Sequence, residues 1–308
     1  MATSVLFQQI LIIFLEIAVG YVAAKCKVIS NENSKFLSNL IMTITLPCTM
    51  LAATNVSGGS DTVLLMLQGA VLLLALYLVS ILVCLVIGKQ LHLTPSQKAV
   101  FIGTAVMPNS AFVGIPLATA ILGEATGMLY VASGTIAYNL VFFTYVVSLF
   151  RPDEKLNIKN FLTPANIATL VMVVMLLTGL QFAKPLQSFI GAVGNCTTPL
   201  ALMIVGVMLA GTPIVEVFRR PILYLISALR CVVFPLVFML VLWLMPLNRT
   251  LCMGITILAA CPAGSLAAVL AKQHSLEPEL AGQAVVQSTL FIVLTVPAML
   301  SLANVLFG

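Results

Sequence analysis

Long apolar stretches dominate this sequence and constrain its fold more than any other feature. We identify ten of them, at 5–24, 36–53, 63–88, 98–122, 127–150, 164–182, 186–211, 221–246, 250–271 and 279–306. A helix of roughly 20 apolar residues spans a bilayer core of about 30 Å, and backbone groups in lipid must be satisfied within the segment. Only 7% of the residues are charged, whereas a soluble domain needs about 25%. The sequence therefore predicts an all-α polytopic membrane protein with ten transmembrane helices.

The basic residues between these stretches are distributed unequally. Of the 14 Lys and Arg residues, all but three fall in connections on one side of the membrane: Lys25, Lys27, Lys35, Lys89, Lys98, Arg151, Lys155, Lys159, Arg219, Arg220 and Lys272. Lys184 and Arg249 fall on the other side, and Arg230 lies within a span. Cytoplasmic loops carry an excess of Lys and Arg. We therefore expect both termini on the non-cytoplasmic side of an inner or plasma membrane.

The reactive side chains form no pattern typical of a cofactor site or an enzyme. The seven Cys and two His residues show no metal-ligand spacing, and no Ser–His or paired-aspartate arrangement occurs. The net charge of +5 follows the loop asymmetry, and no basic–aromatic patch accompanies it. We expect no cofactor, no metal, no enzymatic activity and no nucleic-acid partner.

The ten spans divide into two sets of five. A polar connection at 151–163 separates a first repeat at 1–150 from a second at 164–308. Pro199 follows Pro47 by 152 residues, and Pro262 follows Pro108 by 154, which indicates a duplicated unit. Because five is an odd number, the second copy would be inverted relative to the first. Inverted repeats are typical of secondary transporters.

Pro108 lies about 12 residues beyond the entry of the fourth span near Thr94–Ser96, and Pro262 lies about 12 beyond the entry of the ninth span near Thr250, so each is roughly 18 Å deep from opposite faces. Proline removes a backbone donor and clashes with the preceding turn. Either the two prolines only kink ordinary helices, or they mark broken helices that meet at the midplane. We favour broken helices because the depths match and polar or small residues flank both sites. Two helix N-termini facing the midplane would suit an anion without a basic side chain.

Several short motifs follow one another in a distinctive order and spacing: Gly20-Tyr21, Asn39–Pro47, Pro108–Pro116, Pro262–Ala271, Ala284–Thr289 and Thr295–Pro297. Together they resemble the auxin efflux carrier family, which includes the plant PIN carriers and bacterial malonate-transporter-type permeases. The resemblance covers the whole chain, which lacks the long cytoplasmic loop of many plant members.

This resemblance implies the fold of NhaA-like and PIN-like transporters, with two inverted five-helix repeats. Helices 1, 2, 6 and 7 would form a scaffold, and helices 3–5 and 8–10 a transport domain. Broken helices 4 and 9 would cross at the substrate site. The implied function is elevator-type transport of an organic carboxylate anion, such as malonate or an auxin-like acid. The implied assembly is a homodimer through the scaffold.

The predicted substrate-binding residues lie at the two breaks and at polar positions within spans. They are Pro108, Asn109 and Ser110, then Pro262, Ala263, Gly264 and Ser265, and finally Asn139 and Gln287. Asn109 offers both a donor and an acceptor, and it can also cap the helix that follows it. Asn139, Gln287, Ser288 and Thr289 can equally form interhelical hydrogen bonds.

Two ionisable residues lie deep within spans. Glu16 lies about 11 residues into the first span and Arg230 about 9 into the eighth, so each is roughly 14–17 Å from the start of its span. Such residues are costly in lipid and commonly functional. Glu16 is a candidate for proton coupling, and Arg230 is a candidate carboxylate clamp. Alternatively the two form a structural ion pair, or they bond to backbone carbonyls.

Other functions remain as alternatives. A sodium-coupled anion symporter of the same architecture would use Gln287, Ser288 and Thr289 as weak Na⁺ ligands. A sodium/proton antiporter is disfavoured, because the fifth span reads Ile136–Val141 without a carboxylate. A membrane receptor or a channel is the alternative from another class. A channel would need a polar pore lining, for which few residues are available.

Overall fold

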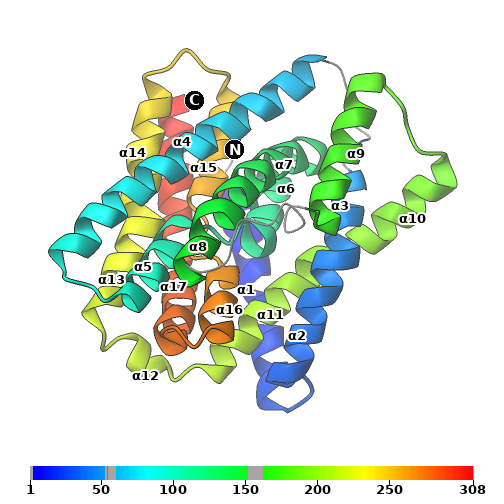
Figure 1. Cartoon of the computed structure of the whole chain (residues 1–308). Coiled ribbons are helices and arrows are strands. Elements are labelled where there is room, and N and C mark those ends of the chain that lie inside the picture. The colour runs from blue at the N-terminus through cyan, green and yellow to red at the C-terminus, as the bar shows by residue number, and fades with distance from the viewer. Residues whose placement is uncertain (1–2, 53, 55–59, 152–161, 308) are drawn as a thin grey trace.

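The computed structural model describes residues 3–52, 54, 60–151 and 162–307. Within these ranges the chain is helical, and the only strand-like element is an isolated bridge between Pro108 and Ala263. Figure 1 shows the helices packed as one bundle with both termini toward its upper end. Most of the predicted connection 151–163 lies outside the described residues, since 152–161 are not described.

The first half of the chain forms helices over all five predicted ranges. They are α1 (Thr3–Lys25), α2 (Asn31–Leu40), α3 (Leu46–Ala52), α4 (Ser60–Gln90), α5 (Pro95–Val106), α6 (Ile115–Leu122), α7 (Glu124–Val141) and α8 (Val147–Phe150).

The second half does the same. Its helices are α9 (Pro164–Thr178), α10 (Lys184–Gly194), α11 (Thr197–Gly211), α12 (Ile214–Val217), α13 (Pro221–Ala228), α14 (Phe234–Trp243), α15 (Arg249–Ala259), α16 (Ser265–Gln273) and α17 (Pro278–Phe307). In the described part, five helices are long and apolar enough to cross a membrane: Asp61–Gln90, Glu124–Phe150, Lys184–Gly211, Pro221–Trp243 and Pro278–Phe307.

Wide π-helical turns join several of these helices. They lie at 41–45, 110–114, 142–146 and 229–233. Three of them are followed within two residues by a proline, namely Pro47, Pro116 and Pro235. Proline cannot donate to the carbonyl four residues before it, and its ring crowds that carbonyl. A wider turn relieves this conflict without breaking the helix.

The helices pack in pairs that link the two halves. α1 lies against α11, and α9 lies against α3, so the first helix of each half contacts part of the second span of the other half. Elsewhere α4 packs on α7 and α13 packs on α17. Buried apolar side chains form one continuous core through these contacts.

Glycines permit the closest of these contacts. A Cβ on Gly20 would lie 2.0 Å from the carbonyl oxygen of Met203, and a Cβ on Gly206 would lie 2.0 Å from that of Ile17. The backbones of α1 and α11 therefore touch directly. Small residues at such crossings are typical of membrane helices, because packing replaces the hydrophobic effect as the attractive force.

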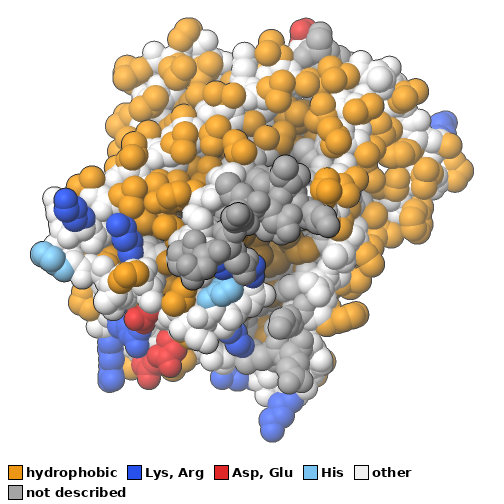
Figure 2. All heavy atoms as spheres, viewed as in Figure 1, with side chains coloured by type: hydrophobic (Ala, Val, Ile, Leu, Met, Phe, Trp, Pro, Cys, Tyr) orange, Lys and Arg blue, Asp and Glu red, His pale blue; other side chains and the backbone are white. Residues whose placement is uncertain are grey.

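Basic side chains collect at one end of the bundle. Most Lys and Arg residues visible in Figure 2 lie along the lower and left edges, whereas hydrophobic side chains cover the upper part. The exposed apolar residues include Leu82 on α4, Leu170 on α9 and Leu294 on α17, each more than 60% exposed. Such a surface fits a lipid environment.

We predict that Gly206→Ala lowers the melting temperature of the purified protein. The added methyl group would overlap the α1 backbone, and overpacking costs about 1–3 kcal/mol. Gly191→Ala on α10 is the matched control, because a Cβ there meets no atom within 4 Å. Thermal unfolding in detergent measures both variants. Equal melting temperatures would show that the α1–α11 contact is not tight.

Candidate functional site

Two helices break at the same place in the structure, at the prolines singled out in the sequence. α5 ends at Val106, and the helix resumes at Ser110 after Pro108 and Asn109. α15 ends at Ala259, and α16 begins at Ser265 after the segment 260–264. Both prolines therefore interrupt helices rather than kink them.

The two broken segments lie antiparallel and bond to each other. The amide of Asn109 donates to the carbonyl oxygen of Pro262 at 2.8 Å, and the amide of Gly264 donates to that of Met107 at 2.8 Å. This pairing satisfies backbone groups that the breaks release. The two broken helices thus meet in one antiparallel β-bridge, between Pro108 and Ala263.

The crossing is tightly packed and shielded from solvent. Asn109 is 4% exposed and Ala263 is fully buried. A Cβ on Gly264 would lie 2.9 Å from the carbonyl oxygen of Pro108, so only glycine lets the two strands approach this closely.

Arg230 binds the ends of both helices that enter the crossing. Its Nη1 donates to the carbonyl oxygen of Val106 at 2.7 Å, and its Nε donates to that of Cys261 at 2.9 Å. Its Nη2 donates to the carbonyl oxygen of Ala259. The side chain is fully buried. A helix C-terminus carries about half a negative elementary charge, so one guanidinium compensates the two ends of α5 and α15.

The helices that leave the crossing present the opposite polarity. Ser110 and Ser265 each begin a helix, and the first amides of a helix have no acceptor within it. Asn109 caps the first of these helices, because its Oδ1 accepts from the amide of Phe112 at 3.3 Å. Among the described residues, its buried Nδ2 has no hydrogen-bond partner. The capping role considered for Asn109 is confirmed, and one buried donor is left for another acceptor.

The amides of Ala263 and Gly264 are already engaged, although the sequence suggested them as substrate donors. That of Ala263 donates to Oγ of Ser288 at 3.0 Å, and that of Gly264 donates to Met107. The free donors of the second break therefore begin at Ser265, which is half-buried.

Of the polar residues predicted in the last span, Ser288 alone bonds to the crossing. Gln287 accepts from the Ser227 hydroxyl at 2.8 Å and donates to the carbonyl oxygen of Val217 at 2.9 Å. Its amide thus ties α17 to α12 and α13. The Thr289 hydroxyl donates to the carbonyl oxygen of Val285 in its own helix at 2.7 Å.

Asn139 lies on α7 and donates from Nδ2 to Oδ1 of Asn166 on α9. This interhelical bond lies apart from the crossing contacts described above. No sequence signal near Asn166 or Ser227 pointed to them, since each is an ordinary polar residue in an apolar span.

Glu16 and Arg230 do not pair with each other. The Arg230 donors go to carbonyl oxygens, whereas the Glu16 carboxylate has a buried Oε2 without a hydrogen-bond partner in the part of the chain that the structure describes. Of the alternatives for Arg230, bonding to backbone carbonyls is the one that the structure contains. The ion pair is not formed.

Comparisons with known proteins agree with this architecture. A family model described as a membrane transport protein matches residues 5–157 and 153–300. The boundary between the two matches falls in the polar connection that separates the halves. A protein of Methanocaldococcus jannaschii, described as an uncharacterized transporter, is 22% identical over 210 residues, which are 65% of this chain and 68% of the relative.

We predict that Arg230→Met lowers the melting temperature strongly, because it strips three buried carbonyls of their charged donor. Each hydrogen bond to a charged group is worth about 1.5–3 kcal/mol. Arg230→Lys should recover only part of the loss, since an ammonium cannot reproduce the guanidinium fork. Arg249→Gln, which removes one exposed contact to Asn304, is the control. A melting temperature for Arg230→Met equal to that of the control would contradict the clamp.

Proposed function

This chain belongs to the membrane transport protein family, and we propose that it is a secondary transporter that moves an organic carboxylate anion. The family and the transporter relative point to transport rather than to enzymatic catalysis. The proposal that the transported substrate is an anion rests on the polarity of the crossing.

The observation that carries the proposal is the unpartnered Nδ2 of Asn109, beside two helix starts. Arg230 already compensates the negative ends of α5 and α15. The positive ends lie at Ser110 and Ser265, where one first-turn amide, that of Phe112, is already bonded to Asn109 Oδ1. Each N-terminus carries about half a positive elementary charge, so an anion is the ligand favoured between them. A carboxylate oxygen would supply the acceptor that Asn109 Nδ2 lacks.

Helix packing around the crossing supports an elevator mechanism. The proposed scaffold combines α1, α2, α3, α9, α10 and α11, which pack on one another. The proposed transport domain combines α4–α8 and α13–α17, and it contains both breaks. The turn that begins at Ser110 contacts α11. A substrate held at this turn would therefore sit at the boundary between the two domains, as alternating access requires.

The same pairings support two inverted repeats. α1 on α11 and α9 on α3 are equivalent contacts if the halves are related by a two-fold axis in the membrane plane. The basic end of the bundle would then be cytoplasmic, with both termini on the opposite side. The homodimer through the scaffold stays a prediction.

We infer that no sodium ion is required. Sodium would need oxygen ligands near the crossing, and the carbonyl oxygens of Val106, Ala259 and Cys261 accept from Arg230 instead. Gln287 and Thr289 are engaged in other bonds. Uptake of radiolabelled malonate into proteoliposomes should be equal in sodium and in choline buffers. Uptake that needs sodium would establish the symporter alternative.

We predict that Asn109→Ala reduces carboxylate transport about ten- to hundredfold, the cost of leaving one or two buried polar partners unpaired. Asn109→Asp should abolish transport, because the aspartate repels the anion while still capping the helix. Counterflow of labelled malonate and of an aromatic carboxylate in proteoliposomes measures both variants.

Asn304→Ala is the matched control, since Asn304 contacts Arg249 away from the crossing. It should transport like the wild type. Full activity of Asn109→Asp would remove the anion site from this position, whatever the cargo is.

A further inference from the structure

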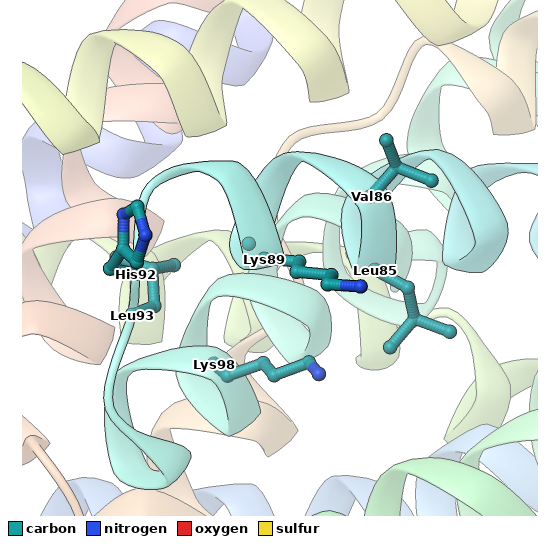
Figure 3. A pocket seen from close by; sticks show the side chains of 7 residues that line it. Leu85, Val86, Lys89, His92, Leu93 and Lys98 are labelled. Atoms are coloured by element: carbon teal, nitrogen blue, oxygen red, sulfur yellow. The ribbon is translucent and has the colours of Figure 1, made fainter.

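A second candidate binding site lies at the basic end of the bundle, away from the crossing. A pocket of about 490 Å³ opens between the end of α4 and the start of α5. Its lining consists of Leu85, Val86, Gly88, Lys89, His92, Leu93 and Lys98. Figure 3 shows the Lys89 and Lys98 side chains extending in the same direction from the two neighbouring helices, with Leu85 beyond their ammonium ends.

The pocket is basic and its lining contains no acidic residue. Lys89 and Lys98 supply two positive charges, and His92 adds a third polar group. Two ammonium groups side by side repel each other, so their arrangement favours a bound anion between them.

Local structure positions Lys98 over the end of α4. Thr94 and Gln97 form a capping box, in which the Gln97 amide donates to Oγ1 of Thr94 and the Thr94 amide donates to Oε1 of Gln97, each at 3.2 Å. This sets the start of α5 and the position of Lys98 one turn later. The Lys98 stem lies over α4 at Gly88, where a Cβ would be 3.7 Å from Lys98 Cγ.

An exposed apolar stripe leads along α4 into the pocket. Leu78 is 50% exposed, Leu82 63% and Val86 58%. These residues are four apart, so they share one face of the helix, and Lys89 follows on the same face. An acyl chain lying along this stripe would place its headgroup at Lys89 and Lys98.

A neighbouring pocket of about 330 Å³ shares Leu93 and includes Arg219 and Arg220. It is less suited to an anion, because Glu277 also lines it and Arg220 lies 3.5 Å from Glu279. Of these two pockets, the α4–α5 pocket is the one that has two lysines, no acidic residue in its lining and an adjacent exposed apolar stripe.

We propose that the α4–α5 pocket binds an anionic phospholipid, with the phosphate between Lys89 and Lys98 and one acyl chain on Leu78, Leu82 and Val86. Basic pockets between membrane helices are suited to anionic headgroups. The ligand is a structural lipid rather than the cargo, so the proposal does not rest on the proposed function.

Native mass spectrometry of the purified protein, titrated with phosphatidylglycerol or phosphatidylcholine, tests this site. The wild type should bind phosphatidylglycerol more tightly. The double variant Lys89→Gln/Lys98→Gln should lose about twentyfold in phosphatidylglycerol affinity, since each lysine near an anionic lipid contributes roughly fivefold. Lys184→Gln, at the other end of the bundle, should leave the affinity unchanged. An equal loss of phosphatidylglycerol affinity in Lys184→Gln would show that only the overall charge of the protein matters. That result would overturn the site.

Two further experiments distinguish a lipid from a soluble phosphate and locate the bound lipid on the chain. Glycerol phosphate at millimolar concentration should not displace the lipid, and full displacement would make this a site for soluble phosphates. A photoactivatable phosphatidylglycerol should label the segment 78–98. Labelling confined to other segments would overturn the assignment even if both glutamine variants misfold.

Discussion

One buried guanidinium joins the two helices on which the centre of this molecule depends. At the middle of a membrane protein no bulk water can satisfy a broken helix, so every released carbonyl must find a donor inside the protein. Arg230 supplies that donor to Val106, Ala259 and Cys261. The two bonds between the broken segments satisfy further groups. Without these contacts, interrupting both helices at this depth would leave several buried backbone groups without hydrogen-bond partners.

The clamp also determines the polarity of what remains. Arg230 compensates the C-terminal ends of α5 and α15, whereas the helices beginning at Ser110 and Ser265 carry no acidic residue in their first turns. The crossing therefore has one side closed by a fixed cation and one side that still favours a negative charge. On the proposed function, this asymmetry would let a chain with 7% charged residues hold an anion at mid-membrane. Backbone amides and one asparagine would perform the role that basic side chains have in soluble proteins.

Much of this architecture is predictable from sequence because its determinants are local. Apolar length predicted helix in each of the ten ranges, and five of these ranges contain a helix long and apolar enough to cross a membrane among the described residues. Pro108 and Pro262 marked the breaks, since proline acts on its own turn. The hydrogen-bond acceptors of Arg230 are not close to it in the sequence. Its three acceptors lie between 29 and 124 residues away, and backbone carbonyls leave no trace in composition. Gln287 illustrates the same limit, because its partners Ser227 and Val217 come from other helices. The sequence likewise did not predict the wide turn at 229–233, which contains Arg230.

The central claim is that the side of the crossing with the helix starts at Ser110 and Ser265 selects for negative charge. Binding of matched ligands tests this claim most directly. Malonate and its neutral diamide have nearly the same shape, and a diamine of similar length carries the opposite charge. Isothermal titration of the purified wild type with each compound, at constant ionic strength, compares charge at fixed size. The account predicts measurable heat of binding for the dicarboxylate or an aromatic carboxylate and none for the amide or the diamine. Binding of the diamine or the amide with no carboxylate bound would contradict it.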